Sequence, residues 1–380
     1  MKILLINFIE FYELPPAKSL LQMLIDQGHT VSVITLAKED YLSEQYRENK
    51  NVQFYNLVEN KTTIQITKPQ NLLDKVVNKF KYVLSSNLTV ASYKAKLRKF
   101  ETVVKESDLV WVLHEYTAKI VGDFIKKNAR DYFLTVYELD SNSSHNAELI
   151  EFARSAKRVI VPEYCRAHII KAWWELDKLP IVLPNKPYGE VFFKDHNLEL
   201  ERKLDKLANR KIVLYQGILT PERKIDNFIE AVSSMGDDYV FAVMGHPSPY
   251  LEFLQDKYQE KFVYLGYAFP PEHLLVTQKA FIGVLSYVAT SQSINPLFCA
   301  PNKTFEYAKF SIPMIGNDIP GLKYTLDYYH MGKCVDENNV QEIVESIKVI
   351  EENYKIYRLN AKRYYDSIDT MTIVESALKF

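Results

Sequence analysis

Short runs of apolar, β-branched residues alternate along the whole chain with longer stretches that have helical periodicity. This alternation is typical of parallel strands connected by helices. In the first half we expect strands at residues 2–8, 30–36, 51–57, 108–114, 132–138 and 158–161. In the second half we expect strands at residues 211–216, 239–244, 262–265, 281–286 and 312–316. The pattern predicts an α/β fold of two Rossmann-like, doubly wound domains that face a central cleft.

The helical stretches fill the gaps between these strands. We expect helices at 17–27, 223–235, 271–279, 303–310 and 340–352, with further helix over 354–380. The polar, charged stretch 196–210 is interpreted as the link between the domains. A length of 380 residues favours two domains, because single cores stop growing near about 250–300 residues. We therefore predict an N-terminal domain over 1–190, a C-terminal domain over 191–361, and a last helix at 362–380 that packs back on the first domain.

Composition excludes several classes of protein. Apolar residues make up 47% and charged residues 25% of the chain, which are ordinary values for a soluble protein. No apolar run approaches the length of a membrane span, and the first strand follows Met1 too closely for a signal peptide. Three widely spaced cysteines, Cys165, Cys299 and Cys334, fit neither a disulfide framework nor a metal site. We expect a cytoplasmic protein.

Charge is distributed unevenly. The net charge of −1 argues against a general nucleic-acid binder. Residues 75–105, from Lys75 to Lys105, nevertheless carry eight cations and one acid, interleaved with apolar and aromatic residues. Such a cationic amphipathic stretch can contact an anionic membrane surface, which suggests a peripheral contact at the inner membrane face. A solvated basic face is the alternative interpretation.

The segment 301–316 has the clearest chemical pattern. It predicts a loop, a short helix that begins near Asn302 as N-cap, and a buried strand. Lys303 would stand at the positive end of that helix, where an anion such as a diphosphate can bind. Glu306 would follow one turn later, within reach of the sugar hydroxyls of the same nucleotide. The alternative is an ordinary capped helix packed beside a sheet.

Several segments together resemble retaining glycosyltransferases of family 4, which have the two-Rossmann (GT-B) fold. The resemblance covers most of the chain. It rests on Gly28-His29-Thr30-Val31, Leu183-Pro184-Asn185-Lys186-Pro187, Val213-Leu214-Tyr215-Gln216-Gly217, Arg223-Lys224, Val243-Met244-Gly245, Tyr264-Leu265-Gly266-Tyr267 and Asn302-Lys303 with Glu306-Tyr307. Each piece is short, and their common order and spacing make the set specific.

The resemblance implies a transfer of sugar from a nucleotide-sugar donor to a glycan or polyprenyl-linked acceptor, in the synthesis of cell-surface polysaccharide or glycoconjugate. No Asp-x-Asp motif is present, so we expect metal-independent transfer without a cofactor. The resemblance also implies retaining transfer of a hexosyl-type sugar. The implied catalytic residues are His114, Arg223 and Lys303, with His114 and Glu138 on the acceptor side. The implied donor-binding residues are Gly217, Arg223, Lys224, Gly245, Tyr267, Asn302, Lys303 and Glu306.

The chain also departs from the family pattern, which keeps other functions open. The first of the two glutamates that the family spaces eight positions apart is replaced by Phe298, and the arginine after the first C-terminal glycine is replaced by Ile218. The glycine pair near the N-terminus is missing, and Pro15-Pro16 stand in that region. A non-catalytic partner subunit of an active transferase and a sugar-nucleotide epimerase are the alternatives. A dinucleotide-dependent dehydrogenase is excluded because no Gly-x-Gly-x-x-Gly turn follows a strand.

Overall fold

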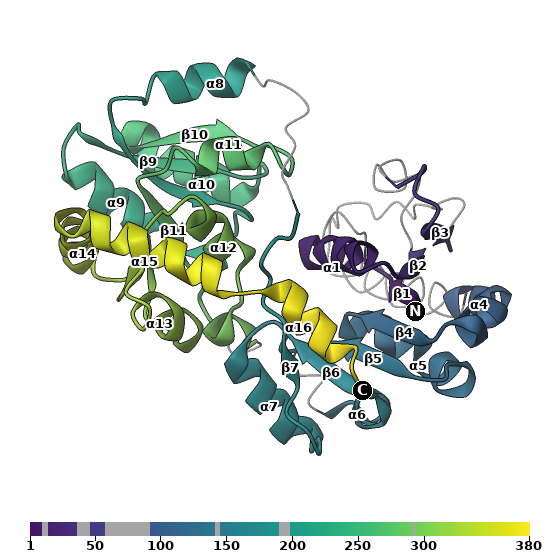
Figure 1. Ribbon diagram of the computed structural model, residues 1–380. Helices are drawn as coiled ribbons and strands as arrows, with labels where there is room; N and C mark the ends of the chain where they lie inside the picture. The colour runs from purple at the N-terminus through teal and green to yellow at the C-terminus, as the bar shows by residue number, and fades with distance from the viewer. Residues whose placement is uncertain (10–13, 36–45, 58–91, 141–144, 190–197, 291–292) are drawn as a thin grey trace, which may run out of the picture. The chain divides into compact units, whose positions relative to one another are not determined.

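Two parallel sheets, each with its own helices, make up the computed structural model (Figure 1). The structure describes residues 1–9, 14–35, 46–57, 92–140, 145–189, 198–290 and 293–380. Contacts within the chain divide it into one unit of 1–183 with 374–380, and a second unit of 184–373. The expected α/β class with two Rossmann-like units is confirmed.

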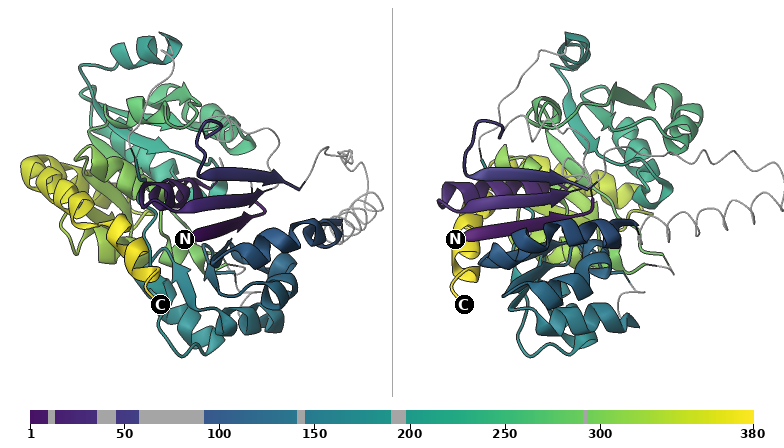
Figure 2. Two further views of the ribbon diagram at one scale, coloured as in Figure 1. Left: turned by 45° about the vertical axis from the view of Figure 1, so that its right-hand side comes forward. Right: turned by 90° about the vertical axis from the view of Figure 1, so that its right-hand side faces the viewer.

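Among the described residues, the first unit is built on seven parallel strands, of which β1, β2, β4, β5 and β6 are buried along most of their length. They are β1 (Lys2–Asn7), β2 (Thr30–Thr35), β3 (Val52–Asn56), β4 (Leu109–Leu113), β5 (Tyr132–Thr135), β6 (Arg158–Val161) and β7 (Ile181–Val182). They pair in parallel in the order β3-β2-β1-β4-β5-β6-β7, and the first three lie side by side in Figure 2. Its helices are α1 (Pro15–Asp26), α4 (Glu101–Glu106) after the short turn η2 (Arg98–Phe100), α5 (Glu115–Asn128), α6 (Ala147–Ser155) and α7 (Tyr164–Trp174). Runs such as Leu109–Leu113 are apolar at every position because helices cover both faces of a parallel sheet.

The second unit repeats this plan. Its strands are β8 (Lys211–Gln216), β9 (Tyr239–Met244), β10 (Phe262–Gly266), β11 (Ile282–Leu285), β12 (Met314–Asn317) and β13 (Gly332–Val335), in the parallel order β10-β9-β8-β11-β12-β13. Its helices are α8 (Leu198–Asp205), α9 (Asp226–Ser234), α10 (Pro249–Tyr258), α11 (His273–Thr277), α12 (Asn302–Lys309), α13 (Pro320–Leu326), α14 (Val340–Glu352) and α15 (Tyr354–Ser367). Single helical turns stand at η4 (Pro221–Arg223), η5 (Gln259–Lys261) and η6 (Asn295–Phe298), and α16 (Thr370–Ala377) crosses from the second unit into the first.

Strand β8 shows how the core of the second unit is filled. Val213 and Tyr215 join one apolar cluster with residues of α9, α10 and α14. Ile212 and Leu214, on the opposite face of the strand, join a second cluster with residues of α8, α12 and α13. Successive side chains of a strand point to opposite faces, so this sheet has a core on each side.

The stretch interpreted as the interdomain link is instead part of the second unit. Residues 198–205 form α8, and Leu200, Leu204 and Leu207 are buried in the cluster that also holds Val240. The leucine spacing gives the stretch an apolar stripe, although its overall composition is polar. The first unit ends at Leu183, after the short strand β7, rather than at residue 190.

Two strands were not expected from the sequence, and the strand expected at 132–138 ends three residues earlier than predicted. Strand β7 has two residues, and β13 carries a lysine and a cysteine among its four, so neither stands out as an apolar run. Strand β5 ends at Thr135, so the expectation that Glu138 ends a strand was wrong. Residues 136–140 have no regular structure.

Most of the basic stretch predicted to contact a membrane, residues 75–91, lies outside the described residues. The described remainder ends in η2 and α4, where Lys105 bonds to Glu101. Among the described helices, none has both the length and the apolar character needed to span a bilayer.

The packing of α8 predicts a loss of stability at one position. Leu204 is 8% exposed, and removing its side chain leaves a cavity between α8 and the sheet. We expect Leu204→Ala to lower the free energy of unfolding by about 2–4 kcal/mol, measured by urea unfolding followed by circular dichroism. Arg202→Ala, on the exposed side of the same helix, is the control. Equal effects of the two substitutions would show that α8 does not pack as described.

Candidate functional site

A pocket opens at the carboxyl ends of three neighbouring strands of the second unit. Strand β8 pairs with β9 on one side and with β11 on the other, so the strand order runs outward from β8 in both directions. Open α/β sheets bind ligands at such a switch point. The pocket has a volume of about 290 Å³. It is lined by Gln216, Gly217, Ile218, Arg223, Met244, Gly245, Tyr267, Ala268, Pro270, His273, Tyr287, Asn302, Lys303 and Glu306. These include every expected donor-binding residue except Lys224.

Glycines at the ends of β8 and β9 bring the backbone close to the pocket. Gly217 has φ 121°, and a Cβ there would stand 3.5 Å from Nζ of Lys303. At Gly245 a Cβ would stand only 2.2 Å from the carbonyl oxygen of Gly217, so a side chain cannot be accommodated without a shift of the backbone. Both positions thus keep the floor of the pocket free of side chains.

Two cations enter this pocket from different elements. Arg223 is the last residue of η4, and Lys303 is the second residue of α12. The ring of Tyr287 lies 4.5 Å from Cζ of Arg223 and 5.1 Å from Nζ of Lys303. The ring of Tyr215 lies 4.3 Å from Nζ of Lys303. Aromatic faces attract cations, so the two tyrosines hold two like charges on one side of the pocket.

The charge on Lys303 is costly in this position. Burial lowers the pKa of Lys303 to about 7, and the neighbouring positive charge of Arg223 adds to the shift, whereas the negative charge of Glu306 opposes it. The ammonium therefore sits near its point of half-titration at neutral pH. An anion in the pocket would favour the protonated form. The negative charge of Glu306 does not fully balance the positive charges of Arg223 and Lys303, so the arrangement suits an anion.

Glu306 is held from two sides. Gln216 donates a hydrogen bond from Nε2 to Oε2 of Glu306 at 2.6 Å, and Nε2 of His273 lies 3.3 Å from Oε1. Burial by itself raises the pKa of Glu306, but the hydrogen bond and charge of His273, the bond from Gln216 and the charge of Lys303 bring the pKa below its usual value. The side chain is 15% exposed and is an ionised acceptor at the pocket wall.

One expectation about these segments was wrong, and one predicted donor-binding residue lies outside the pocket lining. Asn302 is the first residue of α12 and not its N-cap; Pro301 takes the cap position with an extended backbone, and no side chain caps the helix. Lys224 lies just after η4 with φ 37°, and its ammonium contacts Asn338 and lies 3.6 Å from Glu337. The left-handed backbone at Lys224 directs consecutive side chains apart, so Arg223 lines the pocket and Lys224 does not.

Part of the pocket lining is aromatic and apolar. Tyr267 stacks on His246 with ring centroids 3.5 Å apart, and Phe269 meets Tyr267 edge to face at 4.9 Å. Ile218, at the position where the family has an arginine, lines the pocket and is 65% exposed. Phe298 lies in η6 and is not part of the pocket lining. These residues offer surfaces for stacking rather than charged groups.

The expected acceptor-side residues lie in the first unit. His114 follows β4, has φ 75° and caps α5, with Nδ1 accepting a hydrogen bond from the backbone N–H of Tyr116 at 3.1 Å. Burial lowers the pKa of His114 to about 4, so its imidazole is neutral. Glu138 is exposed in the segment after β5. The buried Glu115 lies between these segments: its Oε1 is 3.5 Å from Nδ1 of His114, and its Oε2 accepts from the backbone N–H of Tyr137.

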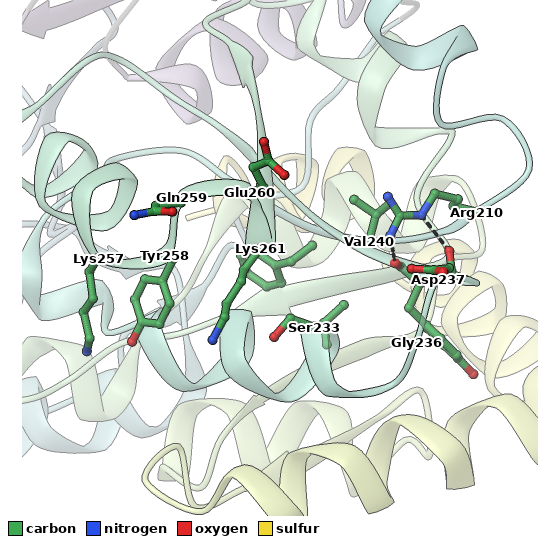
Figure 3. Close-up of a pocket in the computed structure, with 13 residues that line it drawn as sticks. Arg210, Ser233, Gly236, Asp237, Val240, Lys257, Tyr258, Gln259, Glu260 and Lys261 are labelled. Atoms are coloured by element: carbon green, nitrogen blue, oxygen red, sulfur yellow. Dashed lines mark hydrogen bonds between the residues drawn. The ribbon is translucent and has the colours of Figure 1, made fainter.

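A larger hollow of about 570 Å³ lies at the opposite, amino ends of β8, β9 and β10 (Figure 3). Its charged groups include Arg210, which donates to the backbone carbonyl oxygens of Asp237 and Tyr239. These hydrogen bonds tie the residue before β8 to the start of β9, so Arg210 has a structural role. The carboxyl-end pocket, in which Arg223, Lys303 and Glu306 converge, is therefore the candidate site.

Several residues of the site were missed by sequence reasoning. Gln216 was quoted only as part of a motif, although a glutamine that ends an apolar strand is a detectable signal. In the first unit, Glu115 was also missed: it follows the predicted His114 directly, it is buried, and desolvation raises its pKa to about 7. Tyr215, Tyr287 and His273 carry no local signal, because their contacts are with residues distant in the sequence.

Comparison with known proteins gives the same fold and no sequence family. No protein-family model and no curated protein sequence matches the chain. Among solved structures, HepE of Anabaena in complex with UDP-glucose is similar with a TM-score of 0.67 and 15% identity, over 100% of this chain and 98% of that one. Sucrose-phosphate synthase of Thermosynechococcus elongatus is similar with a TM-score of 0.63 and 14% identity, over 99% of this chain and 94% of that one. A glycosyltransferase of Rickettsia africae is similar with a TM-score of 0.63 and 15% identity, over 100% of this chain and 98% of that one. The chain thus has the GT-B fold of these structures.

The shifted pKa of Lys303 predicts a pH dependence of stability. The folded protein releases this proton near pH 7, whereas an unfolded chain holds it until about pH 10.4. Between these values the unfolded state binds more protons, so the contribution of Lys303 to the free energy of unfolding rises with pH. We expect wild type to gain stability relative to Lys303→Met from about pH 7 to about pH 9.5 in urea unfolding. The matched control is Lys348→Met, an exposed position on α14. A difference between wild type and Lys303→Met that does not change with pH would contradict the assignment.

Proposed function

We propose that the protein is a glycosyltransferase that binds a nucleotide-sugar donor in the pocket of its second unit. The observation that supports this most directly is the convergence of Arg223, Lys303 and Glu306 at the switch point of a GT-B fold. The similar structure of HepE holds UDP-glucose. A nucleoside diphosphate carries its negative charge and its ribose hydroxyls a short distance apart. The two cations match the first of these groups, and the carboxylate matches the second.

In this proposal each group has one task. Breaking the bond between sugar and diphosphate places negative charge on the phosphate oxygens, and Arg223 and Lys303 stabilise that charge. Glu306 accepts hydrogen bonds from the ribose, and Tyr267 lies beside the base. Gly217 and Gly245 let the backbone approach the diphosphate. Preorganised positive groups replace the divalent ion of other transferases, which is why we propose metal-independent transfer.

The finer assignments follow the resemblance to family 4. They are retention of configuration, transfer of a hexosyl-type sugar, and a glycan or polyprenyl-linked acceptor in cell-surface polysaccharide or glycoconjugate synthesis. His114 and Glu138 are proposed on the acceptor side. With a pKa of about 4, His114 acts there as a neutral group, and Nε2 carries the proton because Nδ1 accepts from Tyr116.

A non-catalytic partner subunit is the second candidate function, and Ile218 is the observation that favours it. An exposed isoleucine lines the pocket where the family has an arginine, so one source of positive charge is missing. Such a subunit would bind a nucleotide, or none, without transfer. Nucleotide binding and turnover therefore have to be measured separately.

Thermal shift with a panel of nucleoside diphosphates and sugar nucleotides tests the donor site. Each ligand is added once with EDTA and once with a divalent metal ion. A ligand at a hundred times its dissociation constant stabilises by about 2.7 kcal/mol, so we expect a rise in Tm of several degrees with one base. The rise should be the same with EDTA. No shift with any nucleotide would overturn the proposed function.

Substitution of the two cations tests their catalytic role. We expect Lys303→Ala and Arg223→Ala each to lower turnover of the donor about a hundredfold or more, because each removes a preorganised group that stabilises the leaving diphosphate. Arg202→Ala, an exposed arginine on α8, controls for the loss of a surface charge. Turnover near that of wild type in both pocket variants, with folding intact, would refute the assignment. Nucleotide binding by wild type without turnover would favour the partner subunit.

A further inference from the structure

Behind Glu306 lies a chain of hydrogen bonds that reaches back to helix α11. Gln216 donates from Nε2 to Oε2 of Glu306 at 2.6 Å, and Thr277 donates from Oγ1 to Oε1 of Gln216 at 2.8 Å. Gln216 is 2% exposed and Thr277 is fully buried. His273, one turn before Thr277 on the same helix, contacts the other oxygen of Glu306. Both oxygens of the carboxylate are thus held by groups that the sheet and α11 support.

The two bonds to Gln216 determine which way its amide points. The ionised carboxylate can only accept, so the amide nitrogen must face Glu306, whereas the threonine hydroxyl can either donate or accept. The hydroxyl of Thr277 then donates to the amide oxygen. It also lies 3.1 Å from the backbone oxygen of His273, an alternative acceptor on its own helix. Removing the hydroxyl would leave the buried amide oxygen without this donor, and the amide would then be held only by its bond to Glu306.

The remaining acceptor positions of Glu306 define what the carboxylate can bind. Two carboxylate oxygens offer about four acceptor positions, and Gln216 and His273 occupy one on each oxygen. One position on each oxygen stays open at the pocket wall. The spacing of two oxygens on one carbon suits two donors on adjacent atoms, such as the 2′- and 3′-hydroxyls of a ribose.

We propose that Gln216 is a positioning residue that, with Thr277 behind it, aims Glu306 at both ribose hydroxyls and makes the pocket prefer ribonucleotides over 2′-deoxyribonucleotides. This inference rests on the proposed function and adds to it a residue to which the resemblance assigns no role. Gln216 touches Glu306 and not the reacting atoms. Its effect should therefore appear in the discrimination between two ligands rather than in turnover alone.

The test compares the dissociation constants of UDP and 2′-deoxy-UDP by calorimetry, or of the corresponding pair for the base that the nucleotide panel identifies. Wild type should prefer the ribonucleotide by about tenfold or more, since a hydrogen bond to a charged group is lost with the 2′-hydroxyl. Thr277→Val, which keeps the shape of the side chain, and Gln216→Leu should reduce this preference to about threefold or less. Thr277→Ser keeps the hydroxyl and should restore it.

Controls separate positioning from general damage. Gln341→Leu makes the same substitution at an exposed glutamine on α14 and should leave the preference unchanged. If Thr277→Val weakens both ligands by the same factor, or if the preference survives in both Gln216→Leu and Thr277→Val, the positioning role is refuted while nucleotide binding stands. If wild type binds no nucleotide, the proposed function fails and this inference fails with it.

Discussion

The site depends on keeping two positive charges close together in a partly dry pocket. Arg223 and Lys303 repel each other, and burial removes the water that would otherwise solvate them. Three features offset this cost: the faces of Tyr215 and Tyr287, and the negative charge of Glu306. The balance remains incomplete, since the pKa of Lys303 falls to about 7. Charged groups that are already held in place need no reorganisation when an anion enters.

The parallel sheet supplies the precision that this balance needs. Strands β8, β9 and β10 end at the same edge, so their last residues meet although they are far apart in the chain. Gly245 can lie against the carbonyl of Gly217 only because it has no side chain. Gln216, the last residue of β8, is anchored by the strand on one side and by Thr277 on the other. Helix α12 carries Lys303 and Glu306, whereas Arg223 stands at the end of the short turn η4.

The two units place different chemistry beyond the carboxyl ends of their parallel strands. In the second unit the strand ends gather cations, with one ionised carboxylate held by hydrogen bonds. In the first unit the loops after β4 and β5 gather a neutral His114 and a buried Glu115, the latter with its pKa raised to about 7. Burial is the main cause of both shifts; the positive charge of Lys119 adds to the shift of His114, and the negative charge of Glu138 adds to that of Glu115. The two cations Arg223 and Lys303 both lie in the second unit. This is consistent with the proposal that the second unit binds the donor and the first unit the acceptor.

The sequence by itself determined the α/β class, most strand positions and the pairing of Lys303 with Glu306, because apolar runs and helix starts are local patterns. Tertiary structure decided the rest. The polar composition of 198–205 hid the leucine stripe that buries α8 in the second unit. The left-handed backbone of Lys224 separated it from Arg223. Tyr287, His273 and Thr277 acquired roles only when the sheet brought distant segments together. The sequence identifies which side chains are charged, but the strand order decides which residues they contact, and no local pattern in the sequence predicts that order.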